Sequence, residues 1–385
     1  MTMFYGMEDF LAPFLGLYAN RAETPMPASM TAATLQETAQ FGANPGQLRM
    51  LSYVPEELPE GAPLVVVLHG CGQTAAEYDR GTGWSTLADR FGFAVLLPEQ
   101  RRANNANSCF DWFQTEDVTR DSGEAASIAA MVETMVRRHG LDGRRVYITG
   151  LSAGGAMTAA MLATYPDLFA GGAIIAGLPF GSATNVSEAF GAMMQGRVRR
   201  GPELGGRVRE ASAHDGAWPT VSIWQGTADK TVNPMNAEEL RKQWADVHGL
   251  GATPTVTDTV DGAAHRAWRG DDGRMVLETY VIAGLGHATP IDPDAMLPDA
   301  RCGQAAAYIV PAGISSTYRI AESWGLTAQR RANSRPSPDR RASAARPAWV
   351  EYLPLGGESV QDIAARLADT KGIIDKALRS AKLKR

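Results

Sequence analysis

The stretch that most constrains the fold is residues 146–162, where an apolar run, a glycine-flanked serine and a run of small and apolar residues follow one another. The first run is typical of a short buried strand, and the last is typical of a helix. Between them, Gly150 and Gly154 flank Ser152 in the pattern Gly-x-Ser-x-Gly. This pattern predicts a sharp strand-to-helix turn, where glycine is needed because neighbouring backbone crowds the serine.

The helix predicted after Ser152 would direct its unpaired N–H groups and the positive end of its dipole toward the serine. Negative charge that develops on a substrate oxygen would be stabilised at that point. The alternative is a serine in an ordinary turn, because so short a pattern often occurs by chance. The strand before Ser152 and the helix after it favour a nucleophile.

Further apolar runs have the composition of parallel strands that are covered on both faces. These runs are residues 64–68, 93–98, 172–176 and 221–226. Residues 48–54 suit an edge strand, and residues 255–260 and 275–282 suit two more strands. Helices are predicted at 84–91, 234–248 and 316–324, and another helix opens in a capping box at 121–124. Residues 178–218 suit an insertion over the sheet edge. Alternating strands and helices predict an α/β fold: a doubly wound, mostly parallel sheet with helices on both faces.

A serine hydroxyl becomes a strong nucleophile only when a base removes its proton and a third group orients that base. In a doubly wound sheet, such groups lie on loops at the carboxyl ends of strands. Asp229 and His287 each come shortly after a predicted strand. The chain order Ser, Asp, His is the order found in α/β-hydrolases. We therefore predict a catalytic triad of Ser152, Asp229 and His287.

Other residues compete for these roles less well. His69 lies too close to its own strand to act as the base for Ser152. The remaining candidates lie near predicted helix ends (His139, His248), in polar loops (His214, His265) or in less defined turns (Asp215, Asp261). For the oxyanion hole we predict the backbone N–H groups of Ala153 and Cys71, and we favour Cys71 over Gly70. Aromatic residues gather in the loop 104–121, which either lines a cleft or plugs the core.

Several motifs together resemble the poly(3-hydroxybutyrate) depolymerase family of esterases. They are His69–Ala75, Gly81–Trp84, Pro98–Gln100, Asn104–Asn105, Cys109–Phe113, Gly150–Met157, Gln225–Asp229 and Gly286–Pro290. The resemblance covers about residues 48–326 and implies an α/β-hydrolase that cleaves esters through an acyl-enzyme, with the same triad. It also implies that Trp112 lies near the substrate cleft, and Gln73 is predicted to bind substrate.

The resemblance leaves several alternatives open. The substrate would be a hydroxyalkanoate polymer or oligomer, a feruloyl, acetyl or short-chain acyl ester, or a poly(amino acid) amide. An alternative from another class is a non-catalytic binding protein that has kept the hydrolase fold. Cys71 and Cys109 are placed like a pair that can form a disulfide in this family, although a cytosolic location would argue against a stable bridge. No cofactor and no metal is implied, because the three cysteines lack metal-site spacing.

The bulk composition excludes two kinds of partner. A net charge of −5 gives no electrostatic case for nucleic acid. No apolar run approaches the roughly 18 residues needed to span a bilayer. The first basic residue is Arg21, so the chain start lacks the basic flank of a secretory signal, and the expected location is cytoplasmic. The alternative is an extracellular location, as in many members of the family.

The chain divides into four segments by composition. Residues 1–45 carry an apolar stripe at helical spacing, which is either packed on the main domain or presented to an apolar polymer or a membrane face. Residues 46–326 form the predicted catalytic domain, and 327–348 are an Arg-, Pro- and Ser-rich linker of disordered character. Residues 349–385 suggest a short helix and a basic tail, which is either solvated or docks to polymer granules or a protein.

Overall fold

The computed structural model describes residues 34–328 of the chain. The apolar stripe predicted near the N-terminus and nearly all of the predicted linker and tail lie outside the described residues. Within residues 34–328, no helix has the length and apolar character needed to cross a membrane.

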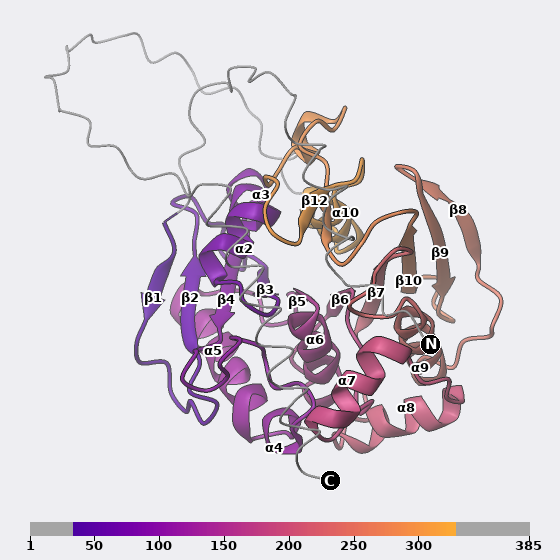
Figure 1. Cartoon of the computed structure of the whole chain (residues 1–385). Coiled ribbons are helices and arrows are strands. Elements are labelled where there is room, and N and C mark those ends of the chain that lie inside the picture. Colours follow the sequence, from indigo (N-terminus) through magenta and orange to yellow (C-terminus); the bar gives the residue numbers. More distant parts are fainter. Residues whose placement is uncertain (1–33, 329–385) are drawn as a thin grey trace, which may run out of the picture. The chain divides into compact units, whose positions relative to one another are not determined.

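A ten-stranded sheet forms the centre of this part of the chain, in the order β1-β2-β4-β3-β5-β6-β7-β10-β9-β8 (Figure 1). Its strands are β1 (Gln36–Thr38), β2 (Arg49–Tyr53), β3 (Leu64–Leu68), β4 (Ala94–Glu99), β5 (Val146–Leu151), β6 (Gly171–Ile175), β7 (Thr220–Gly226), β8 (Val256–Val260), β9 (Ala263–Arg269) and β10 (Met275–Ile282). The strands from β4 to β10 in this order pair in parallel, whereas β1, β2, β9 and β8 pair antiparallel at the two sides. A mostly parallel sheet was predicted, and this prediction is confirmed.

Helices cover both faces of the sheet, as predicted (Figure 1). The elements with helical structure are α2 (Ala75–Thr82), α3 (Trp84–Phe91), α4 (Thr115–Val118), α5 (Gly123–His139), α6 (Ala153–Thr164), α7 (Val186–Gln195), α8 (Gly201–Glu210), α9 (Met235–Val247), the 3₁₀ turn η2 (Pro298–Ala300) and α10 (Ser316–Ser323). Buried side chains of α5, α6, α8 and α9 pack in one core, and those of α2, α3 and α10 pack in the other. The continuous apolar strands are buried because both faces are covered.

The structure differs from the prediction at the margins of the sheet. The strand predicted as the edge, β2, has β1 paired along its outer side, and β1 lies within the segment predicted as residues 1–45. The predicted insertion at 178–218 contains α7 and α8, both of which contact α9, rather than an irregular cover over the sheet edge. Strand β9 and a two-stranded parallel sheet, β11 (Thr289–Ile291) with β12 (Ile309–Pro311), were not predicted.

Candidate active site

Ser152 lies on a strained turn between β5 and α6. Its φ of 59° is in the left-handed region, which side chains other than glycine rarely adopt. The Ser152 N–H donates a hydrogen bond to the Ile175 carbonyl at 2.9 Å, which ties the turn to the end of β6. Strain of this kind is retained where surrounding structure fixes it, and it is common at functional sites.

The two glycines of the motif allow the turn to pack tightly. A Cβ on Gly154 would lie 2.4 Å from the Leu68 carbonyl oxygen and 2.6 Å from that of His69. A Cβ on Gly150 would lie 2.4 Å from the Gly154 carbonyl oxygen. The predicted reason for glycine at these positions, crowding by backbone, therefore agrees with the geometry.

Asp229 and His287 lie on adjacent loops at the carboxyl ends of β7 and β10. Two backbone hydrogen bonds join these loops, from Thr227 N–H to the Ile282 carbonyl at 3.0 Å and from Ala228 N–H to the Leu285 carbonyl at 2.9 Å. The His287 Nδ1 atom lies 2.8 Å from Asp229 Oδ2, and the Asp229 side chain is fully buried. The sequence predicted this pair from residues that are 58 positions apart.

The surroundings of Asp229 favour its ionised form. Its Oδ1 accepts the N–H groups of Thr231 at 2.8 Å and Val232 at 2.9 Å. Burial by itself would raise the pKa of Asp229, but the His287 ring and these N–H groups hold it below its ordinary value. An ionised carboxylate only accepts hydrogen bonds, so the proton lies on His287 Nδ1 and leaves Nε2 free to accept one.

Ser152 and His287 lie at the same edge of the sheet. Ser152 follows β5 and His287 follows β10, and the two strands β6 and β7 lie between them, with adjacent strands about 4.8 Å apart. In the described residues no hydrogen bond joins the Ser152 hydroxyl to the His287 ring. Catalytic hydrogen bonds often tighten only when substrate is bound. The contact of Ser152 with His287 therefore stays a prediction.

The corner after β3 supplies one unused backbone donor. Gly70 N–H donates to Gln73 Oε1 at 2.9 Å, and Gly72 N–H donates to the Asn107 carbonyl at 2.7 Å. Cys71 N–H has no acceptor within the described part of the chain. Contact of Gly154 with the Leu68 and His69 carbonyls brings this corner next to the first turn of α6, which begins at Ala153. This geometry favours Cys71 over Gly70 as the partner of Ala153.

His69 fixes the orientation of this corner, a role that the sequence analysis missed. Its Nε2 accepts the Gln100 N–H at 3.1 Å, so its Nδ1 carries the proton and donates to the Gly70 carbonyl at 2.8 Å. Burial lowers the pKa of His69 and keeps the ring neutral. The Gly70 carbonyl and the Cys71 N–H belong to one planar peptide and point in opposite directions. Holding the carbonyl therefore fixes the direction of the N–H.

A disulfide joins Cys71 to Cys109. The pairing implied by the family resemblance is therefore present. It connects the corner after β3 to the aromatic loop after β4.

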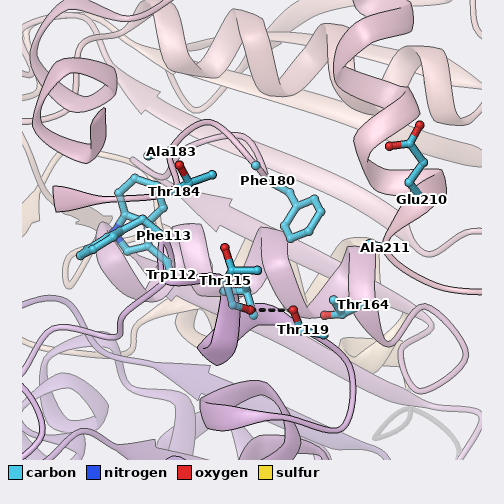
Figure 2. Close-up of a pocket in the computed structure, with 12 residues that line it drawn as sticks. Trp112, Phe113, Thr115, Thr119, Thr164, Phe180, Ala183, Thr184, Glu210 and Ala211 are labelled. Atoms are coloured by element: carbon cyan, nitrogen blue, oxygen red, sulfur yellow. Dashed lines mark hydrogen bonds between the residues drawn. The ribbon is translucent and has the colours of Figure 1, made fainter. Parts of the chain in front are cut away.

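The two residues predicted to bind substrate have different surroundings. Both polar atoms of the Gln73 amide are used within the protein, by the Gly70 N–H and by the Ala307 carbonyl at 3.0 Å. Trp112 is only 7% exposed and lines a cavity of about 240 Å³ with Phe113 and Phe180 (Figure 2). Neither Ser152 nor His287 lines that cavity, which reaches Thr164 at the far end of α6. The aromatic loop therefore lines a cavity through Trp112 and Phe113, and it also fills part of the core through the fully buried Phe110.

Three carboxylates meet beneath the aromatic loop: Asp111, Asp117 and Glu124 have oxygen atoms within 4.8 Å of one another. Burial raises the pKa of each. The Glu124 carboxylate already accepts the Gln100 amide and, at 3.0 Å, the Asp111 N–H. These hydrogen bonds tie the loop to α5, and we assign no ion to the cluster.

The mostly parallel sheet, with the nucleophile turn after β5 and the Asp–His pair on later loops, defines a protein of the α/β-hydrolase class. Comparison with known families is more specific. The family described as "Esterase PHB depolymerase" matches residues 49–272, more than half of the chain. The chain belongs to this family.

Individual relatives agree with this assignment. The chain is 44% identical to "Poly(3-hydroxyalkanoate) depolymerase C" of Paucimonas lemoignei, over 78% of this chain and 72% of that one. It is 32% identical to "Feruloyl esterase B" of Talaromyces stipitatus, over 69% and 75%. The solved acetyl xylan esterase from Aspergillus awamori matches with a TM-score of 0.64 and 26% identity, over 76% of this chain and 99% of that one. The protein is a carboxylic-ester hydrolase of the serine α/β-hydrolase type.

Proposed function

We propose that this esterase hydrolyses poly(3-hydroxyalkanoate), as polymer or as oligomers. The observation that carries the proposal is the 44% identity to a poly(3-hydroxyalkanoate) depolymerase, against 32% to a feruloyl esterase. Both matches cover most of the chain, so the difference does not arise from a short motif. Polyester units and aryl esters share the same scissile bond, so the substrate differs in what surrounds that bond.

The proposed reaction has two half-reactions. His287 Nε2 takes the proton of Ser152, whose oxygen attacks the ester carbonyl; the oxyanion is held by the N–H groups of Cys71 and Ala153. His287 then protonates the leaving alcohol, which departs and leaves an acyl-serine. Water, deprotonated by His287, attacks the acyl group and releases the hydroxy acid. The 2.8 Å contact of His287 with buried Asp229 supports this scheme, because it orients the imidazole.

Ser152→Ala tests this function directly. The variant should lower release of 3-hydroxybutyrate from a poly(3-hydroxybutyrate) suspension by about 10⁴-fold, because the nucleophile is removed. Ser182→Ala is a matched control, since that buried hydroxyl has no hydrogen-bond partner in the described structure. Unchanged release by a folded Ser152→Ala variant would reject the nucleophile.

A feruloyl or acetyl esterase is the second candidate. The structural match to an acetyl xylan esterase, which covers 99% of that chain, favours this second function. Relative kcat/KM for hydroxybutyrate oligomers, methyl ferulate and acetylated xylan would decide between the two. Amide cleavage of a poly(amino acid) stays a third alternative and belongs in the same panel.

Contact with polymer granules through the N-terminal segment or the basic tail is also part of the proposal. The support is compositional: an apolar stripe in residues 1–45 and basic residues near the end of 349–385. Co-sedimentation of the Ser152→Ala variant with polymer granules, with and without residues 329–385, would measure how much of the granule binding depends on the tail.

A further inference from the structure

A tyrosine that the sequence analysis did not single out lies beside the predicted base. Tyr308 directly precedes β12, and His287 comes two residues before β11, the strand with which β12 pairs. The ring centroids of Tyr308 and His287 are 6.0 Å apart, with the ring planes at 73°. The Tyr308 carbonyl accepts the Thr289 N–H at 2.8 Å. Backbone and ring together hold Tyr308 against the His287 side of the site.

The turn that carries Tyr308 is anchored from two further elements. The Gln73 amide donates to the Ala307 carbonyl at 3.0 Å, which joins the turn to the corner that holds Cys71. Gln304 N–H donates to the Gly81 carbonyl at 2.9 Å, which joins it to α2. Tyr308 itself has a φ of 61°, a strained value for a residue with a side chain. The turn is therefore fixed between the predicted oxyanion hole and the predicted base.

The hydroxyl of Tyr308 has no partner in residues 34–328. Several other tyrosine hydroxyls of this chain do form hydrogen bonds, such as Tyr53 with Asp89 at 2.7 Å and Tyr78 with Thr289 at 3.0 Å. Tyr308 is half-buried, and its hydroxyl is not among the fully buried polar atoms that lack a partner. Burial raises the pKa of Tyr308, so the hydroxyl keeps its proton and can donate it.

The position of Tyr308 indicates which half of the ester it meets. His287 delivers its proton to the leaving oxygen, so a ring packed on His287 flanks the alcohol half. In a hydroxyalkanoate chain, the alcohol half carries a second ester carbonyl two carbons from the carbon that bears the leaving oxygen. Resting on the proposed function, we propose that Tyr308 is a substrate-binding residue whose hydroxyl donates a hydrogen bond to this second carbonyl. The contact selects ester chains over simple alkyl esters.

Two butyrate esters with the same acyl group test this contact. One is sec-butyl butyrate, whose alcohol has no second carbonyl; the other is the butyrate ester of methyl 3-hydroxybutyrate, whose alcohol has one. The measurement is kcat/KM for butyric acid release by the full chain. Tyr308→Phe keeps the ring against His287 and removes only the hydroxyl. It should lower kcat/KM about 5- to 10-fold for the second ester and less than 2-fold for the first.

Tyr53→Phe is the control, because it removes a hydroxyl that binds Asp89 on the surface, and it should leave the ratio of the two esters unchanged. Equal losses on both esters with Tyr308→Phe, or no loss on either, would overturn the proposal. A wild-type enzyme without preference for the second ester would overturn it too. If the preference is seen and lost as expected but the polymer releases no product, the polymer assignment fails and the Tyr308 contact stands.

Discussion

At the scale of single residues, Gln73 shows how a predicted role changes once its neighbours are known. The motif suggested a substrate contact, but both amide atoms are taken up by the Gly70 N–H and the Ala307 carbonyl. By accepting the Gly70 N–H, Gln73 holds the peptide that directly precedes the one carrying the Cys71 N–H. We therefore propose that Gln73 positions the predicted oxyanion hole, and its contact with substrate stays a prediction.

Gln73→Ala should lower kcat about 10- to 100-fold with little change in KM, because a mispositioned oxyanion donor weakens the transition state more than substrate binding. Gln73→Glu keeps an acceptor for the Gly70 N–H and should recover part of the loss. The kinetics of p-nitrophenyl butyrate hydrolysis would show both effects. Gln304→Ala, at an exposed position of the neighbouring turn, is the control. Equal activity of Gln73→Ala and wild type would contradict the positioning role.

Residue types and local spacing were enough to predict Ser152, Asp229 and His287, because each follows a strand that is visible in the sequence. The roles of His69 and Tyr308 were not visible. They depend on contacts with Gln100 and with His287, which the fold brings together from separate loops. For His69, the only local signal in the sequence was its position directly before a glycine-rich corner.

At the scale of secondary structure, the prediction succeeded where burial leaves a simple pattern. β3, β5 and β6 are buried at every position; β3 is a continuous apolar run, and β5 and β6 consist mostly of apolar residues and glycine. β9 alternates only partly between buried and exposed positions, and β1, β11 and β12 have three residues each, too few to show a period. The predicted capping box also failed: the N-cap of α5 is Ser122, whose side chain makes no capping bond.

The junction of β5 with α6 gives a prediction for the element. Gly154→Ala should destabilise the fold by about 2–3 kcal/mol and impair activity, because its Cβ would meet two backbone carbonyls at 2.6 Å or less. Gly206→Ala is the matched control, since it lies in α8 with no atom within 4 Å of the added Cβ. It should stabilise by about 0.5–1 kcal/mol through helix propensity. Urea unfolding of both variants would measure the contrast, and equal effects would refute the packing argument.

At the scale of the whole molecule, the disulfide bears on where the protein works. The sequence predicts a cytoplasmic protein, although a reducing compartment would oppose the Cys71–Cys109 bond. The structure contains that bond, and disulfides persist mainly in oxidising environments. We therefore propose the extracellular alternative, and cell fractionation of the native producer would test it.

The bond should stabilise the whole fold by restricting the unfolded chain. It joins residues 38 positions apart, a closure that corresponds to about 4 kcal/mol in the loop-entropy view. Dithiothreitol should therefore lower the midpoint of thermal unfolding, and it should also lower activity, because Cys71 carries the predicted oxyanion donor.

The double variant Cys71→Ala, Cys109→Ala is the control, and the same reagent should leave it unchanged, since the remaining thiol, Cys302, is already reduced and buried. If reduction shifts the midpoint of the double variant as much as that of wild type, the stabilisation does not come from this bond. A shift in wild type alone, together with lost activity, would show that one covalent link serves both the fold and the site.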